Sequence, residues 1–334
     1  MTRDAQTLYS NSLVIDGLQT CAWSRPVFEE MRAAGLTVVN AASLLWENFS
    51  EGMAYIRTWE QLFADNADLI MPIRNVDDIE TAKRTGRTGI SIGWQNTSPL
   101  EDRLDYIRLF KLLGVNIMQL TYNTQNYSGA GYLELRDSGL TGFGREVIAE
   151  MNRQGVLCDL SHVGDLTAAE VIEHSRKPVC ISHVLPRALH DVKRNKPDDL
   201  FRACAAKGGV IGLSLFAPGL KAGNDATIED YLDAMSYVLD VVGENHVAIG
   251  TDFSTGHPRP GPWQVWANRD KGYARQLTNF AQTVIRKPAG IATITETPNL
   301  VPAMLRRGWS ETRITKILGE NWLRVFRETW TAET

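Results

Sequence analysis

The sequence predicts an α/β fold of the (β/α)8 or TIM-barrel class, and three observations predict it. Short apolar, β-branched runs of strand length alternate with amphipathic segments of helical period along the chain. Eight such runs occur, which is the number of parallel strands that closes a barrel. The length of 334 residues also suits one barrel, because such domains run to about 250 residues and beyond. We expect a single domain over residues 1–334, although two smaller domains would fit the same length.

The eight runs fit strands that are buried on both faces, as parallel strands are. In chain order they cover residues 12–17, 37–43, 89–95, 115–123, 156–162, 178–184, 209–216 and 247–253. Residues 101–113 and 144–154 are amphipathic and are expected to form helices between strands. No Gly-x-Gly-x-x-Gly motif follows the first run, so the pattern favours a closed barrel over an open dinucleotide-binding sheet.

Composition and charge exclude several classes of protein. With 43% hydrophobic and 22% charged residues, the chain can build a packed core and is not of disordered composition. The formal net charge is −4 and no basic run occurs, so we expect no nucleic-acid partner. No apolar run is long enough to span a bilayer, and the charged N-terminus lacks a signal-peptide core. The four cysteines are scattered without metal-site spacing. We therefore expect a cytoplasmic protein without a membrane partner, whose cysteines are buried and reduced.

Polar side chains stand where the predicted strands end, and a barrel builds its active site from those ends. His162 and His183 end two neighbouring strands, and Asp252 ends the last one. Imidazole and carboxylate groups at a barrel mouth are common ligands of a catalytic divalent metal. A single histidine in such a place is more often a hydrogen-bonded structural residue, and that alternative stays open for each of the two. The combination with Asp252 favours a metal-dependent hydrolase.

Several motifs in this order carry a family resemblance. They are Asp-Leu-Ser-His at 159–162, Ser-His at 182–183, Arg-Asn-Lys-Pro-Asp-Asp at 194–199 and Gly-Thr-Asp-Phe at 250–253. With these motifs the chain resembles the membrane (renal) dipeptidase family, peptidase family M19 of the amidohydrolase superfamily, over nearly its whole length. The resemblance implies a (β/α)8 barrel and a zinc-dependent hydrolase of dipeptides or related amides. Its members use two zinc ions bridged by a carboxylate and a hydroxide.

The resemblance also assigns roles to single residues. His162 and His183 match the two histidine ligands of one zinc ion. Asp252 matches the aspartate that handles the proton of the nucleophilic water. Arg194 matches the arginine that holds the substrate carboxylate, for which a forked guanidinium is suited. Tyr122 stands where the family has a histidine near the substrate carbonyl, and its phenol is expected to donate a hydrogen bond there.

At other positions the chain departs from the family pattern. Leu18 and Thr20 stand where the family has a His-x-Asp pair of ligands, and Gln95 stands where it has the bridging glutamate. Two dications close together repel strongly, and the site has lost two carboxylates and one imidazole that would compensate them. We therefore expect one zinc ion rather than two, held chiefly by His162 and His183. Gln95 is expected as a weak third ligand, and Asp252 as a ligand or as the general base.

Aromatic residues surround the substituted positions. Trp94 directly precedes Gln95, and Trp263 and Trp266 lie in a long stretch at about 254–290 that is expected to fold over the mouth as a lid. We expect Trp94 to contact the substrate. A cage of such rings would attract a methylated ammonium group, and the alternative is that these tryptophans only fill the core.

Together these patterns predict a metal-dependent hydrolase that cleaves a dipeptide or related amide of a small, carboxylate-bearing substrate, with a mononuclear zinc site. The alternative is a catalytically silent or metal-free barrel that binds a small amino-acid-derived metabolite. Metal analysis, and activity measured with and without a chelator, separate the two. The resemblance further implies a homodimer.

Overall fold

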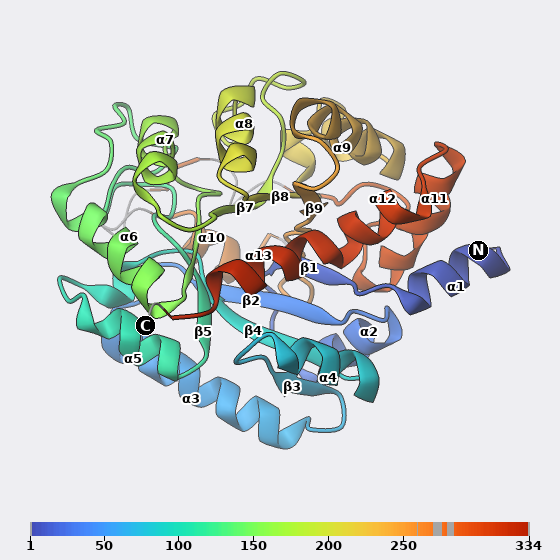
Figure 1. Cartoon of the computed structure of the whole chain (residues 1–334), viewed down its shortest axis with the longest axis horizontal. Coiled ribbons are helices and arrows are strands. Elements are labelled where there is room, and N and C mark those ends of the chain that lie inside the picture. The colour runs from blue at the N-terminus through green and yellow to red at the C-terminus, as the bar shows by residue number, and fades with distance from the viewer. Residues whose placement is uncertain (1, 259, 270–275, 279–283, 333–334) are drawn as a thin grey trace.

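The computed structural model describes residues 2–258, 260–269, 276–278 and 284–332. Strands and helices alternate, and the helices surround a barrel of parallel strands (Figure 1). The sheet runs in the order β1-β2-β4-β5-β6-β7-β8-β9, and β3 pairs with β4 outside this path. The predicted (β/α)8 barrel is therefore confirmed.

Eight strands coincide with the eight predicted runs. The strands are β1 (Ile15–Gln19), β2 (Val38–Leu44), β3 (Ile70–Pro72), β4 (Thr88–Trp94), β5 (Val115–Gln119), β6 (Leu157–Asp159), β7 (Cys180–Val184), β8 (Val210–Leu213) and β9 (Val247–Ile249). β3 has only three residues and was not predicted from the sequence. Several strands end earlier than predicted, because the polar residues at their carboxyl ends leave the sheet and form the loops of the mouth.

The barrel closes between β1 and the residues that follow β9. The Thr20 amide donates to the Phe253 carbonyl at 2.7 Å, and the Asp252 amide donates to the Leu18 carbonyl at 3.0 Å. Below this seam the buried carboxylate of Asp16 accepts hydrogen bonds from the amide and hydroxyl of Thr251 at 2.8 and 2.5 Å. Asp252 is therefore held at the point where the two ends of the sheet meet.

Helices lie around the outside of the barrel and at its two ends (Figure 1). They are α1 (Arg3–Asn11), α2 (Arg25–Ala33), α3 (Phe49–Asp65), α4 (Asp77–Thr85), α5 (Asp105–Leu112), α6 (Gly142–Gln154), α7 (Asp165–His174), α8 (Asp198–Ala206), α9 (Ile228–Val242), α10 (Pro262–Ala267), α11 (Leu300–Arg306), α12 (Glu311–Thr315) and α13 (Asn321–Thr329). The amphipathic segments predicted at 101–113 and 144–154 correspond to α5 and α6. Thr141 caps α6 by accepting from the Gly144 amide, as N-cap threonines do.

The amino-terminal end of the barrel interior is apolar and is closed by α13. Trp322 of this helix is fully buried among the first residues of the strands, and its indole donates to the Ile249 carbonyl at 2.9 Å. Gly17 permits this contact, since a Cβ there would lie 2.3 Å from the Trp322 ring. The polar residues of the interior are thereby confined to the opposite, carboxyl-terminal end.

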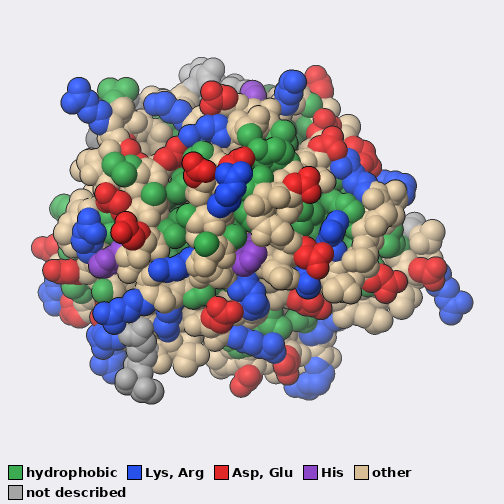
Figure 2. Space-filling view, turned by 45° about the horizontal axis from the view of Figure 1, so that its top comes forward, with side chains coloured by type: hydrophobic (Ala, Val, Ile, Leu, Met, Phe, Trp, Pro, Cys, Tyr) green, Lys and Arg blue, Asp and Glu red, His purple; other side chains and the backbone are tan. Residues whose placement is uncertain are grey.

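The outer surface mixes charges of both signs. On the face shown in Figure 2, Lys and Arg side chains are interspersed with Asp and Glu side chains. All four cysteines are buried and free, as expected. Among the described residues, no helix has the length and apolar character needed to cross a membrane.

Candidate active site at the mouth of the barrel

A cavity of about 350 Å³ opens at the carboxyl ends of the strands. Its polar walls come from residues at or just after β1, β4, β5, β6 and β9 and from the loop that follows β7. These residues are Thr20, Gln95, Tyr122, Asn123, His162, Arg194 and Asp252. The predicted site residues Gln95, Tyr122, His162, Arg194 and Asp252 are thus brought together, as a barrel mouth requires.

The two predicted histidines contact each other directly. The Nε2 atoms of His162 and His183 lie 2.9 Å apart, and their rings are tilted at 49° with centroids 5.0 Å apart. His183 is fully buried and does not line the cavity, whereas His162 does. The pair therefore presents one ring to a ligand and keeps the other beneath it.

Each outer nitrogen of the pair has its own partner. His162 Nδ1 lies 2.7 Å from Asn123 Oδ1, and His183 Nδ1 lies 2.7 Å from the Ser182 hydroxyl oxygen. The same hydroxyl lies 2.5 Å from Asp159 Oδ2. A continuous hydrogen-bonded chain thus runs from Asp159 through Ser182 and both imidazoles to Asn123.

Arg194 closes over this chain. One of its terminal nitrogens donates to the Ser161 carbonyl at 2.9 Å, and the other donates to the His183 carbonyl at 2.9 Å and to His162 Nε2 at 3.2 Å. Its guanidinium also lies 5.8 Å from the ring centroid of Tyr132, another wall of the cavity. A fixed positive charge therefore stands at the ring nitrogen of His162.

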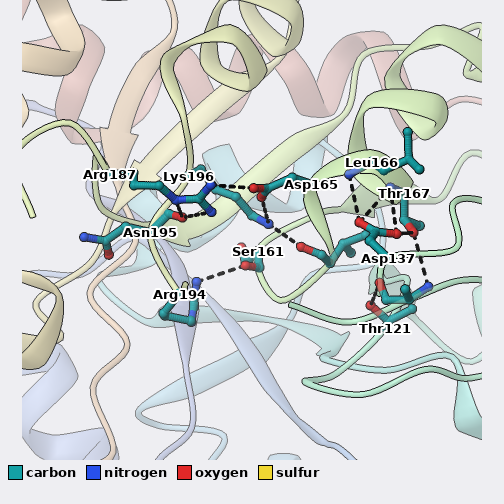
Figure 3. Close-up of polar contacts among 12 residues, drawn as sticks. Thr121, Asp137, Ser161, Asp165, Leu166, Thr167, Arg187, Arg194, Asn195 and Lys196 are labelled. Atoms are coloured by element: carbon teal, nitrogen blue, oxygen red, sulfur yellow. Dashed lines mark hydrogen bonds and ion pairs between the residues drawn. The ribbon is translucent and has the colours of Figure 1, made fainter. Parts of the chain in front are cut away.

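Figure 3 shows the ion pairs that hold the loop carrying Arg194. Arg187 donates to Asp165 at 2.6 Å and to the Asn195 carbonyl, and the fully buried Lys196 donates to Asp165 at 3.2 Å and to the Val163 carbonyl. Asp165 begins α7, which follows β6, so the loop after β7 is tied to the loop after β6. Asn195 and Lys196, which belong to the Arg-Asn-Lys-Pro motif at 194–197, thus hold the loop in place next to Arg194.

Burial and charge set the protonation of these groups. Burial lowers the pKa of His162 and of His183 well below the usual value, and the nearby Arg194 lowers both further. Both imidazoles are therefore neutral at physiological pH. Burial raises the pKa of the Tyr122 phenol, with smaller contributions from Tyr132 and Asp252, so this hydroxyl stays protonated and can donate.

Two residues of the cavity wall have left-handed backbone. The φ angles are +60° at Asn123 and +56° at Asp252, a region that non-glycine residues seldom adopt. Lys287 holds the backbone of Asp252 by donating to its carbonyl at 2.5 Å. Such conformations gather at functional sites, where the surrounding contacts enforce them. They turn the two side chains out of the strand direction at the mouth.

The opposite side of the mouth is neutral. Leu18 is fully buried, and the buried hydroxyl of Thr20 has no hydrogen-bond partner among the described residues. Gln95 lines the cavity, but its amide nitrogen donates to the Ala42 carbonyl at 3.0 Å. None of these three side chains carries a charge.

Trp94 does not reach the cavity. It is fully buried, and its ring packs at 78° against Phe110 of α5, with centroids 4.4 Å apart. Successive side chains of a strand point to opposite faces, so Gln95 faces the mouth while Trp94 faces the helices. The structure therefore gives Trp94 a core role in place of the expected substrate contact.

Part of the predicted lid borders the cavity. Trp263 and Ala267 of α10, together with Asn268, Thr278, Ile285 and Lys287, line its walls. Trp266 packs with Trp263 against the cluster of Trp46 and Tyr122. Residues 259, 270–275 and 279–283 of the expected lid lie outside the described part of the chain.

Sequence reasoning missed several groups of the site. Asn123 and Ser182 stand next to residues that it selected, so a search of the neighbours of Tyr122 and His183 would have found them. Lys193 and Lys287 also line the cavity. Lys287 follows a stretch without strand or motif character, and nothing in the sequence indicates its place.

The donor set does not fit the zinc site that the resemblance implies. The structure brings no three His, Cys, Asp or Glu side chains together as a metal-binding group within its described residues. The Nε2 of His162 already accepts from Arg194, and Gln95 offers a neutral amide. A zinc ion with three protein ligands needs free, deprotonated donors directed at one point.

The closed parallel barrel and the polar mouth at its carboxyl end define a (β/α)8 barrel of the type found in metal-dependent hydrolases. The match to the membrane dipeptidase family (peptidase family M19) covers residues 5–264 and 279–334. The chain belongs to this family.

Similar proteins agree with this assignment. An amidohydrolase from Pseudomonas aeruginosa is 48% identical, with a TM-score of 0.94 over 98% of this chain and 99% of its own. The probable dipeptidase PvdM from the same organism shares the fold at 18% identity, with a TM-score of 0.84 over 99% of this chain and 98% of its own. Dipeptidase 3 of Rattus norvegicus is 28% identical over 73% of this chain. The chain spans less than half of that relative, 46% of its length.

Proposed function

We propose that this protein is a dipeptidase-like hydrolase that cleaves a dipeptide or a related amide of a small substrate with a free carboxylate. The observation that carries the proposal is the convergence of Arg194, Asp252 and Tyr122 on one cavity of about 350 Å³. Cavities of roughly 300–1,000 Å³ accommodate small molecules. Membership of the dipeptidase family and the names of the similar proteins support the reaction class.

In this proposal the guanidinium of Arg194 holds the substrate carboxylate by charge-assisted hydrogen bonds. Asp252 accepts a proton from a water molecule, whose oxygen attacks the amide carbonyl. The Tyr122 hydroxyl donates to the oxyanion of the tetrahedral intermediate. The C–N bond then breaks, and the proton on Asp252 passes to the leaving amine, which restores the carboxylate.

The metal-dependent form of this function would have one zinc ion on His162 and His183, with Gln95 or Asp252 as the third ligand. It is what the family resemblance implies, and it would supply the activated water. The donor set described above does not support it. The test of function is therefore run with and without a chelator.

The experiment is a hydrolysis screen of dipeptides and N-acyl amino acids, each paired with its C-terminal amide. Turnover of the free acids that is lost in the amides supports the carboxylate anchor. Asp252→Asn keeps the side-chain shape, and asparagine tolerates left-handed backbone, so the variant tests the base without disturbing the turn. We expect it to lower kcat at least 100-fold, a loss typical of removing a general base. An unchanged kcat would contradict the role of Asp252.

A second candidate function is a barrel that binds a small amino-acid-derived metabolite without turning it over. The neutral side of the mouth, formed by Leu18, Thr20 and Gln95, favours it, because catalytic ligand positions have become uncharged. Calorimetric titration of the same compounds distinguishes the candidates. Saturable binding of substrates that stay intact would identify a binding protein.

A further inference from the structure

We infer that Thr20 and Gln95 form a subsite for an uncharged hydrogen-bonding group at the end of the ligand that is remote from its carboxylate. The ligand is then an N-acyl amino acid whose acyl group carries a hydroxyl or an amide, in preference to a dipeptide with a free ammonium group. The inference rests on the proposed function for the carboxylate end of the ligand and adds the chemistry of the other end. Because it concerns binding, it is tested whether or not the compound is cleaved.

The Thr20 hydroxyl is a buried polar group in the wall of the cavity. The residue is 1% exposed and lines the cavity, and its hydroxyl has no hydrogen-bond partner among the residues that the structure describes. The Thr20 amide donates to the Phe253 carbonyl at 2.7 Å, so the backbone fixes the residue in this place. A buried hydroxyl lowers stability unless something pairs with it. We therefore expect a bound ligand to supply the partner.

Gln95 offers a hydrogen-bond acceptor to the same cavity. Its Nε2 donates to the Ala42 carbonyl at 3.0 Å, and because a carbonyl can only accept, this contact fixes which end of the side-chain amide is the nitrogen. The Oε1 of the same amide accepts no hydrogen bond from any residue in the described ranges. Gln95 lines the cavity, so this acceptor is left for a ligand.

Strand pairing brings these two groups together. Gln19 pairs with Ala41 in the register of β1 and β2, so Thr20 comes next, beside Ala42. The carbonyl of Ala42 is the one that accepts from the Gln95 amide. The side chain of Gln95 thus reaches from the end of β4 across β2 toward the residue that follows β1.

Arg194 stands on the other side of the mouth. It lies in the loop after β7, and β7 is the fourth strand after β2 in the sheet order β2-β4-β5-β6-β7. Since eight strands form the closed ring, β7 and β2 face each other across the barrel. A ligand whose carboxylate is bound by Arg194 therefore directs its acyl end toward Thr20 and Gln95.

The charges near this subsite favour an uncharged group over an ammonium group. Neither Thr20 nor Gln95 is charged, and Asp252 is the single carboxylate among the described residues that line the cavity. Lys287 donates to the Asp252 carbonyl at 2.5 Å and lines the cavity too, so a cation already stands beside Asp252. An ammonium group placed here would lose its hydration and be repelled by Lys287. A hydroxyl or an amide pairs with Gln95 and Thr20 at no such cost.

The test uses three ligands that differ in one group at the same position. Glycylglycine ends in an ammonium group, N-glycoloylglycine in a hydroxyl and N-propionylglycine in a methyl group. Each is titrated into the full chain by calorimetry, and kcat/KM is compared where the compounds are cleaved. We expect N-glycoloylglycine to bind at least about 10-fold more tightly than either of the others, because the methyl group leaves the hydrogen-bonding groups unpaired and the ammonium group is repelled.

Two variants connect this preference to the subsite. In Thr20→Val/Gln95→Leu, which removes both groups at similar volume, we expect the hydroxyl and methyl compounds to bind within about 2-fold of each other. Thr124→Val is the matched control: its hydroxyl is also buried without a partner among the described residues, but Thr124 does not line the cavity. This control is expected to keep the wild-type preference. Circular dichroism shows whether each variant is folded.

Gln95→Glu tests the charge argument in the opposite direction. A carboxylate at this position would compensate an ammonium group, so we expect glycylglycine to become the preferred compound of the three, by about 5-fold or more. A folded Gln95→Glu variant that keeps the wild-type order would contradict the placement of the acyl end at Gln95.

The outcomes separate this inference from the proposed hydrolysis. Preferred binding of N-glycoloylglycine without cleavage of any compound supports the inference while the hydrolase fails. Glycylglycine as the tightest ligand, or as the substrate with the highest kcat/KM, overturns the inference and leaves the hydrolase intact. Failure of all three compounds to bind at millimolar concentration overturns the inference as well. A preference for the hydroxyl compound that survives in Thr20→Val/Gln95→Leu would place the subsite elsewhere.

Discussion

The two sides of the barrel mouth differ in charge and in how their side chains are hydrogen-bonded. On the side of β6 and β7, hydrogen bonds join the side chains of Asp159, Ser182, His183, His162 and Arg194. Ion pairs behind them fix the loop. On the side of β1 and β4, Leu18 is buried, and Gln95 donates to the Ala42 carbonyl. The buried Thr20 hydroxyl there has no partner in the part of the chain that the structure describes. One side of the mouth is thus organised around a fixed cation, and the other is lined by neutral side chains.

The contrast has a physical reason. Burying a charged group is costly unless partners compensate it. On the charged side, Asp165 stands between Arg187 and Lys196 and offsets part of the cost of burying them. On the neutral side no ion pair is needed, because burying a neutral side chain costs less than burying a charged one. Variants on each side therefore test this difference between the two halves of the mouth.

The largest effect is expected from Lys196, the buried cation behind Arg194. Burial lowers its pKa from 10.5 to about 8, against the opposing effect of Asp165. Below pH 8 the lysine is charged in both folded and unfolded chains, and the cost of burying the charge is fully present. As the pH rises from 8 to 10.5, the folded chain releases the proton first, so this group raises the free energy of unfolding by about 3 kcal/mol.

Urea unfolding at about pH 7 and about pH 10 measures this gain. We expect Lys196→Met to lack it, while the exposed Lys221→Met keeps it. Burial also lowers the pKa of Lys111 to about 8, so only the difference between wild type and the Lys196 variant isolates the group. If the two proteins show parallel pH dependence, the buried charge does not carry the cost assigned to it.

A smaller effect is expected from Ser182→Ala on the same side. The hydroxyl links Asp159 to His183 and also lies 3.1 Å from the Ser161 hydroxyl. Its removal leaves buried polar atoms unpaired, and we expect unfolding to require about 2 kcal/mol less. The exposed Ser10→Ala on α1 is the control and should change stability by less than about 0.5 kcal/mol. If the two variants were equally stable, the hydrogen bonds from Asp159 through Ser182 to His183 would not stabilise the fold.

The smallest effect is expected on the neutral side, from Gln95→Glu. A carboxylate added to the cavity should repel the ligand and weaken N-acetylglycine binding about 5-fold, or about 1 kcal/mol. Gln95→Ala, measured by the same calorimetric titration, should bind within about 2-fold of the wild type. If Gln95→Glu bound zinc and gained affinity for the probe, the neutral side would belong to a metal site after all, and the contrast between the two sides would fail.

The sequence was sufficient to predict the site residues that lie at or near the carboxyl ends of strands. Apolar runs identified the strands, and motifs placed His162, Arg194 and Asp252 at one mouth. The role of Trp94 could have been excluded, because its neighbour Gln95 points the other way along the strand. The contact between His162 and His183 and the position of Lys287 depend on tertiary packing of distant segments, which no local pattern encodes.

The seam that closes the barrel has a consequence for the order of folding. Asp16 and Thr251 are 235 residues apart in sequence, and the amide of Asp252 pairs with Leu18 beside them. Contacts of such long range form late, because the entropy of closing the intervening chain must be overcome first. The cavity acquires its carboxylate only when this seam closes. A chain with its secondary structure formed but its seam open would be compact and inactive, and recovery of ligand binding would lag behind recovery of helix content during refolding.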